Sequence, residues 1–330
     1  MEKNLRILIT IICLAAVFLL TFTLASILDP RGQVRVNALA PDETRLNSSP
    51  LPVSHSFPFQ NGTVTISTAL NSSVYHGAKT TDKLVRVRGG VPLATWEAES
   101  ARTMIADPAL DDFFNDLLIH FREIRIERNL TDDEYAELLT AYSQSFRYRA
   151  TDNPPKYPIE TVYEEEGDCD DMSLLLAGLL SREGYKTALL LFEKDNHMVA
   201  GIGSDDNQYL GTEYAFVDIM DYSFIGVPVN QLRGSDIMYL DPIVIPIGSG
   251  TKIYHRGKET RYIADMATLT YGRSGNLSVQ MKIVRQDTAE YTRISADFNT
   301  NSRIYTYIIR HRFDRPGVYE YLKREMAGES

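Results

Sequence analysis

The sequence has few cysteines, no excess of positive charge and a single long apolar run. Only two cysteines occur among 330 residues, and the formal net charge is −10. Such a chain lacks the clustered Lys and Arg that bind phosphate, so no nucleic acid is expected as a partner. The hydrophobic fraction of 44% and the charged fraction of 24% are those of a globular protein with a buried core. No internal repeat is evident.

The one long apolar run extends from Ile7 to Leu28 and contains 22 residues without a charge. At about 1.5 Å per helical residue, it is long enough to cross a hydrocarbon layer. A cleaved signal peptide is the alternative, but its apolar region usually has only about 7 to 15 residues. We therefore expect a short cytoplasmic N-terminus over 1–6 and a transmembrane signal-anchor over 7–28. The protein would be single-pass in the cell membrane, with its globular part outside the cytoplasm.

The chain after the apolar run contains an unpaired thiol and several candidate glycosylation sites, and the glycosylation sites suit an outside location. Cys13 lies inside the run, which leaves Cys169 without a partner for an intrachain disulfide beyond it. Five Asn-x-Ser/Thr sequons, candidates for N-glycosylation, all follow the run. They begin at Asn47, Asn61, Asn71, Asn129 and Asn276.

Composition and periodicity divide the rest of the chain into three parts. Residues 29–60 are rich in Pro, Ser and Asn and predict a flexible stalk. Residues 61–235 form the main domain. Residues 236–330 are expected to be a β-rich C-terminal extension, because Val279, Met281 and Ile283 alternate with polar residues and 304–309 is β-rich. A closing helix is expected at 318–325.

Inside the main domain, helices precede strands. The pattern predicts helices over 110–127, from the Thr131-x-x-Glu134 capping box onward, and from about Cys169 to Glu183 with Gly184 as its C-cap. A hairpin follows at 187–192 and 197–202, and then a strand over 209–218. The expected fold class is therefore α+β.

Cys169 is the candidate nucleophile because it begins a helix. The dipole and free amides of a helix N-terminus favour the thiolate. Asp168, Asp170 and Asp171 would raise its pKa if they pointed at the sulfur, but about 100° of helical rotation per residue allows solvent to screen them. The alternative is a cysteine that acts only as a small buried hydrophobic side chain.

His197 is the candidate base, because it opens the second strand of the hairpin that follows the Cys169 helix. Asp218, on the next strand, could orient the imidazole, with Asp221 as the second choice. Structural roles for His197 and Asp218 remain the alternatives. Gln144 could donate to an oxyanion, or could be an ordinary surface amide.

Four short motifs lie between about residues 134 and 228. They are Tyr157-Pro158-Ile159-Glu160-Thr161, Gly167-Asp168-Cys169-Asp170-Asp171-Met172-Ser173, Leu179-Leu180 with Gly184-Tyr185, and His197-Met198. Together they resemble the transglutaminase-like cysteine protease superfamily, in particular its membrane-anchored archaeal and bacterial subgroup. The resemblance implies a papain/transglutaminase-like core in which the Cys-bearing helix packs on an antiparallel sheet, with Cys169, His197 and Asp218 as the triad. The family's acid usually precedes Pro-Thr or Thr-Thr, whereas Asp218 precedes Ile219-Met220.

The aspartates on either side of Cys169 suggest that a metal ion could bind there. Asp168, Asp170 and Asp171 could contribute oxygens to Ca²⁺, but their spacing is not that of an EF-hand, and a solvated loop is the alternative. A zinc site would lack a close-spaced pair of ligands. No other cofactor is expected.

The preferred function is acyl transfer or hydrolysis on peptide or glutamine amides, through a thioester on Cys169 and with a protein or peptide as substrate. A catalytically inactive binding module with the same fold is the alternative from another class. A calcium-dependent processing protease is the third possibility.

Overall fold

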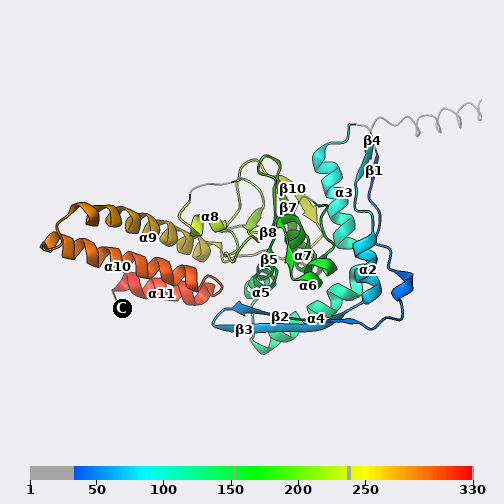
Figure 1. Cartoon of the computed structure of the whole chain (residues 1–330), viewed down its shortest axis with the longest axis horizontal. Helices are drawn as coiled ribbons and strands as arrows, with labels where there is room; N and C mark the ends of the chain where they lie inside the picture. Colours follow the sequence, from blue (N-terminus) through cyan, green and yellow to red (C-terminus); the bar gives the residue numbers. More distant parts are fainter. Residues whose placement is uncertain (1–32, 89, 152, 236–238, 329–330) are drawn as a thin grey trace, which may run out of the picture.

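The computed structural model describes residues 33–88, 90–151, 153–235 and 239–328 (Figure 1). The fold is α+β, with many helices around small, mostly antiparallel sheets, as the sequence predicted. The strands are β1 (Gln33–Arg35), β2 (Leu51–Phe59), β3 (Gly62–Leu70), β4 (Arg86–Arg88), β5 (Arg147–Tyr148), β6 (Glu166–Gly167), β7 (Thr187–Phe192), β8 (His197–Gly203), β9 (Tyr214–Val217) and β10 (Ile243–Ile247).

The α-helices are α2 (Ser72–Thr80), α3 (Leu93–Ala106), α4 (Asp111–Glu127), α5 (Asp132–Gln144), α6 (Pro158–Glu164), α7 (Cys169–Arg182), α8 (Val229–Leu232), α9 (Gly257–Ile283), α10 (Ala289–Arg310) and α11 (Arg315–Ala327). Short 3-10 helices lie at Glu43–Arg45, Pro108–Leu110 and Glu193–Asp195.

The centre of the molecule is α7 packed against a four-stranded sheet of order β10-β7-β8-β9 (Figure 1). All neighbours in this sheet are antiparallel, and Phe192 pairs with His197 at the closed end of the β7–β8 hairpin. Side chains on alternate positions enter two different apolar clusters, one shared with α7 and one on the opposite face. Every residue of β8 is buried. His197 therefore opens a strand that is covered on both faces.

Several predicted elements are confirmed. Helix α4 coincides with the predicted helix at 110–127, and α5 begins with the Thr131–Glu134 capping box. Helix α7 begins at Cys169 and is followed by Gly184, whose φ of +82° is the left-handed conformation that glycine adopts most easily. The β7–β8 hairpin and the closing helix α11 are also present.

The predicted flexible stalk over 29–60 is wrong for its described part. Residues 51–59 pair along their full length with β3, and Phe57 and Phe59 are buried in the core. The backbone of Ala40 lies so close to Gly77 of α2 that an added Cβ would be 2.3 Å from the Ala40 carbonyl oxygen. The prolines of β2 suggested an irregular segment. A strand forms nevertheless, because each strand of a two-stranded ribbon has a free edge, where proline is tolerated.

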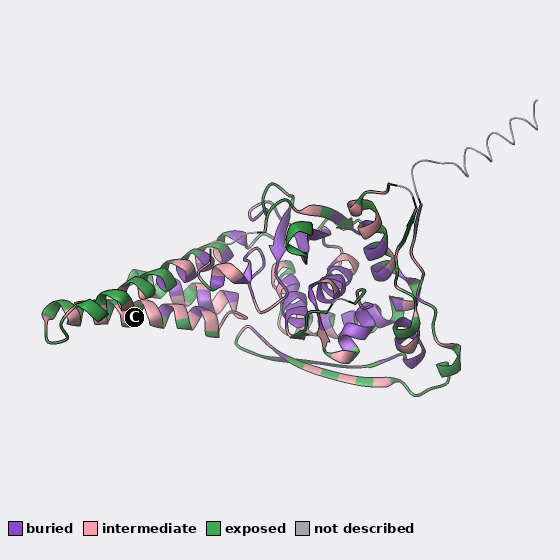
Figure 2. Cartoon of the chain, turned by 45° about the horizontal axis from the view of Figure 1, so that its top comes forward, coloured by how far each residue is buried: buried purple, intermediate pink, exposed green. Residues whose placement is uncertain are grey.

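The predicted β-rich extension over 236–330 is also wrong. Its described part contains one strand, β10, followed by the long helices α9, α10 and α11, which project from the main body (Figure 1). Val279 and Ile283 alternate with polar residues but are 60% and 80% exposed on α9, so their spacing reflects no buried strand face. In α10, Ile304 and Ile308 are one helical turn apart and buried. Burial is greatest near the main body and decreases toward the tip of the helices (Figure 2).

The predicted membrane location is corrected. None of the helices within the described ranges has the length and apolar character needed to cross a membrane. The N-terminus 1–6 and the run at 7–28, on which that prediction depended, lie outside the described residues.

Candidate functional site

The first turn of α7 is held by the acidic residues around Cys169. Asp168 is the N-cap, and its Oδ1 accepts hydrogen bonds from the amides of Asp170 and Asp171, each at 3.2 Å. Asp171 forms the reciprocal bond, in which its Oδ2 accepts from the Asp168 amide at 3.2 Å. Its Oδ1 accepts from the Lys156 amide at 2.6 Å. Two of the three proposed calcium ligands thus act as a capping box. The described residues include no group of three or more His, Cys, Asp or Glu placed to hold a metal ion.

The sulfur of Cys169 is enclosed, with 9% of the residue exposed. Its Sγ lies 3.5 Å from Oδ1 of Asp170, which accepts the thiol hydrogen bond. Burial, followed by the charge of Asp170, raises the pKa of the thiol to about 12, although a hydrogen bond from the backbone of Met198 opposes the shift. The expected thiolate, favoured by the helix dipole, is therefore not the resting state at neutral pH, because the thiol is buried and Asp170 faces the sulfur instead of solvent.

His197 is buried and neutral. Its ring contacts those of Tyr239 and Phe192, with centroid distances of 4.5 and 6.3 Å. Burial lowers the pKa of its imidazole to about 4, and the nearby charge of Asp195 opposes the shift. Its buried Nε2 has no hydrogen-bond partner among the described residues. A neutral imidazole with a free ring nitrogen is able to accept a proton.

The junction of α7 and β8 brings Cys169 and His197 into one region. The hydroxyl of Ser173, one turn after Cys169, donates to the carbonyl oxygen of Met198 at 3.2 Å. The Met198 backbone also acts on the Cys169 thiol, whose pKa it lowers. The residue that follows His197 is therefore fixed against the first turn of the Cys169 helix. Within the described residues, no hydrogen bond joins the sulfur directly to the imidazole.

Asp218 is buried just after β9 and is occupied by backbone contacts. Its Oδ2 accepts from the Val229 amide at 2.8 Å and its Oδ1 from the Met220 amide at 3.2 Å. Burial raises the pKa of its carboxyl despite these bonds. The second choice, Asp221, pairs instead with Arg312 at 3.0 Å and Arg233 at 3.1 Å. In the described structure neither carboxylate is hydrogen-bonded to His197.

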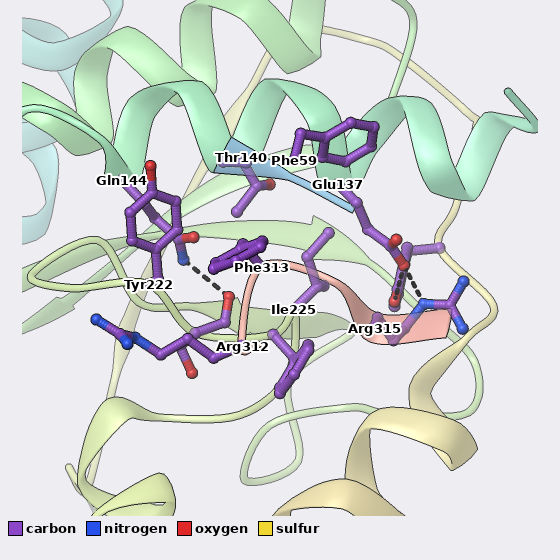
Figure 3. A pocket seen from close by; sticks show the side chains of 13 residues that line it. Phe59, Glu137, Thr140, Gln144, Tyr222, Ile225, Arg312, Phe313 and Arg315 are labelled. Carbon is purple, nitrogen blue, oxygen red and sulfur yellow. Dashed lines mark hydrogen bonds and ion pairs between the residues drawn. The ribbon is translucent and has the colours of Figure 1, made fainter. Parts of the chain in front are cut away.

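Gln144 is buried and supports the Asp218 loop, so the alternative of a surface amide is wrong. Its Nε2 donates to the carbonyl oxygens of Asp218 at 2.6 Å and Ser223 at 3.0 Å, and Figure 3 shows its side chain lining a pocket near Tyr222. Both amide hydrogens are thus used. As an oxyanion donor, Gln144 would have to break one of these bonds.

Three residues that sequence reasoning did not select contribute to the site. Tyr148 has its pKa raised to about 12, first by burial and then by the charges of Cys169 and Asp168, and Tyr239 packs on His197. Asp195 acts on His197 through its charge. Asp195 could have been found from its place in the hairpin turn, two residues before His197. The tyrosines carry no pattern that links them to the site.

The five sequon asparagines are all exposed. Asn71 also caps α2, since its Oδ1 accepts from the amides of Ser73 and Val74. Glycosylation of these asparagines stays a prediction.

Replacement of Asp170 with asparagine is expected to make Cys169 more reactive, because the carboxylate raises the thiol pKa by charge and as hydrogen-bond acceptor. A decrease of one pKa unit gives about ten times more thiolate, partly offset by lower nucleophilicity, so alkylation by iodoacetamide at pH 8 should be about threefold faster. Mass analysis of the Cys169 peptide provides the rate. The exposed Asp297→Asn is the control, and an unchanged rate in Asp170→Asn would contradict the expectation.

Comparison of the chain with family models, with curated proteins and with solved structures found no match. The candidate site is therefore defined by the geometry of this chain. It consists of a protonated thiol at a helix start and a buried, neutral imidazole at the adjoining strand.

Proposed function

We propose that the protein is a thiol enzyme of the transglutaminase-like type, which transfers or hydrolyses acyl groups of peptide or glutamine amides with Cys169 as nucleophile and His197 as base. The observation that carries the proposal is the junction of α7 and β8. There the Ser173 hydroxyl, one turn after Cys169, donates to the Met198 carbonyl oxygen at 3.2 Å, and His197, one residue earlier, keeps a buried ring nitrogen without a partner. An unpaired buried nitrogen is unfavourable and calls for a functional reason.

The reaction needs only the groups in this junction. The thiol proton of Cys169 passes to the imidazole of His197 while the sulfur forms a bond to the amide carbonyl carbon. The C–N bond then breaks, and the amine leaves with the proton. Water resolves the thioester to a carboxylic acid, or a second amine resolves it to a new amide.

The resting protonation states favour general-base catalysis over a preformed ion pair. With the pKa of Cys169 raised to about 12 and that of His197 lowered to about 4, the thiol and imidazole are both neutral at pH 7. Proton transfer therefore accompanies attack on the substrate.

An activated ester tests the proposal without knowledge of the natural substrate. Incubation of the chain with p-nitrophenyl acetate should release p-nitrophenol and add one acetyl group to Cys169, detectable by peptide mass analysis. Cys169→Ala should abolish this acylation. His197→Ala should slow it about 100-fold, because a positioned base typically contributes at least that factor.

The matched control is His120→Ala, which removes a half-exposed histidine of α4. Its rate should equal that of the unchanged chain. If Cys169 were acylated equally fast with and without His197, the imidazole would not be the base. A non-catalytic binding module would then be the better account of this fold.

A further inference from the structure

A groove on another part of the molecule contains none of the three triad candidates. It has a cavity volume of about 310 Å³ and lies where the start of α4 meets the junction of β3 and α2. Its apolar floor is formed by Leu70, Val74, Phe113 and Ile159. This volume is at the lower end of the range for small-ligand sites, and the lining combines this apolar floor with polar side chains.

One side of the groove carries uncompensated negative charge. Asp112 and Asp116 are one helical turn apart on α4, are exposed, and line the groove. Among the described residues, neither forms an ion pair or a side-chain hydrogen bond, whereas the neighbouring Asp111 pairs with Arg182 at 3.2 Å. Two like charges at this spacing repel each other, so a cation placed between them would relieve that repulsion.

A serine hydroxyl at the same groove also has no partner within the described residues. Ser72 is 3% exposed and lines the groove, and its side chain forms no hydrogen bond within the described residues. The adjacent helix start does not favour an anion, because Asn71 already caps the amides of Ser73 and Val74. A hydroxyl on a nearly buried side chain with no protein partner is available to bond a ligand or solvent in the groove.

We propose that this groove binds a lysine or arginine side chain of an extended peptide or protein partner. The aliphatic stem lies on the apolar floor, and the charged end lies between Asp112 and Asp116, within reach of the Ser72 hydroxyl. Lys and Arg side chains bind in this way because their stems are apolar and their ends are not. An anionic ligand is disfavoured by both carboxylates, and a purely apolar one would leave them uncompensated.

Calorimetric titration of the full chain with acetyl-Ala-Leu-Lys-Leu-Ala-amide tests the proposal. The same peptide with norleucine in place of lysine keeps the stem and removes the charge. The lysine peptide should bind at least tenfold more tightly than the norleucine peptide. Its affinity should decrease between 50 and 500 mM salt, since the carboxylates are exposed.

The double variant Asp112→Asn/Asp116→Asn should weaken binding of the lysine peptide at least tenfold. Folding is not at risk, because both side chains are exposed and the change removes a repulsion. The control Asp265→Asn/Asp297→Asn changes the net charge equally at exposed positions on α9 and α10 and should bind as the unchanged chain does. Equal binding of both peptides, equal loss in both double variants, or no binding of the lysine peptide at millimolar concentration would each overturn the proposal.

Discussion

Replacement of Arg315 with methionine is expected to lower the free energy of unfolding by about 3–5 kcal/mol. Arg315 begins α11 and is buried, and its guanidinium bonds two carboxylates of other helices, Glu137 of α5 at 2.5 Å (Figure 3) and Glu259 of α9. Glu137 also accepts a hydrogen bond from the Tyr254 hydroxyl at 2.8 Å. Loss of the cation would leave the buried Glu137 charge with no ion-pair partner and only the Tyr254 hydrogen bond, at the point where the C-terminal helices join the main body.

Urea unfolding followed by circular dichroism measures this change. The control is Arg285→Met, because the Arg285–Asp287 pair is exposed and such pairs contribute at most about 1 kcal/mol. The second variant, Arg315→Met with Glu137→Gln, removes the uncompensated charge and should recover much of the lost stability. Equal losses in the Arg315 and Arg285 variants would show that burial of the pair is unimportant.

The loss should also depend on pH. Burial raises the pKa of Glu137, and Arg315 partly opposes the shift, so the pKa is raised further in Arg315→Met. A carboxyl whose folded-state pKa is raised binds more protons in the folded state than in the unfolded state, so the folded state gains stability as pH decreases. The deficit of the variant should therefore be largest at pH 7 to 8 and smaller at pH 5.

Replacement of Gly178 with alanine is expected to destabilise the protein by about 2 kcal/mol. Gly178 lies inside α7, where the change from glycine to alanine normally stabilises a helix by about 1 kcal/mol. Here an added Cβ would be 2.4 Å from Cζ of Phe114, a fully buried ring of α4 that Arg182 covers at 3.8 Å. The contact must separate α7 from α4 or displace the ring.

Thermal or urea unfolding of Gly178→Ala should be compared with that of Gly272→Ala. Gly272 lies inside α9, and an added Cβ there would have no heavy atom within 4 Å, so this variant should be stabilised by about 0.5–1 kcal/mol. The two substitutions are chemically identical and differ only in packing. Stabilisation by both would mean that α7 and α4 are not in close contact at Gly178.

Local signals predicted the elements that carry the candidate site. The capping box at Thr131 and Glu134, the helix start at Cys169 and the turn before His197 each depend on residues close together in the sequence, and the structure contains all three. Such signals work because caps and hairpin turns are made by neighbours along the chain. They also indicated that a helix bearing Cys169 precedes a strand bearing His197.

Distant contacts decided the parts that the sequence analysis missed. The alternation of apolar residues around Val279 and the prolines of β2 do not by themselves identify the secondary structure of these segments. That structure depends on which face is buried, and burial depends on residues far along the chain. That burial explains why β2 lies beside β3. It also explains why α9 to α11 are helices. Local periodicity alone favoured the opposite assignments.

Some features of the candidate site likewise follow from local sequence, and others depend on contacts between distant segments. The available side chains, a thiol at a helix start and an imidazole at a strand start, follow from local sequence alone. Three other features depend on the folded chain. The Asp218 carboxylate binds backbone amides, Gln144 bonds carbonyls 74 and 79 positions away, and burial reverses the expected pKa shift of Cys169. Protonation states and hydrogen-bond partners depend on burial and on groups brought together from distant segments, and for this reason only the folded chain determines them.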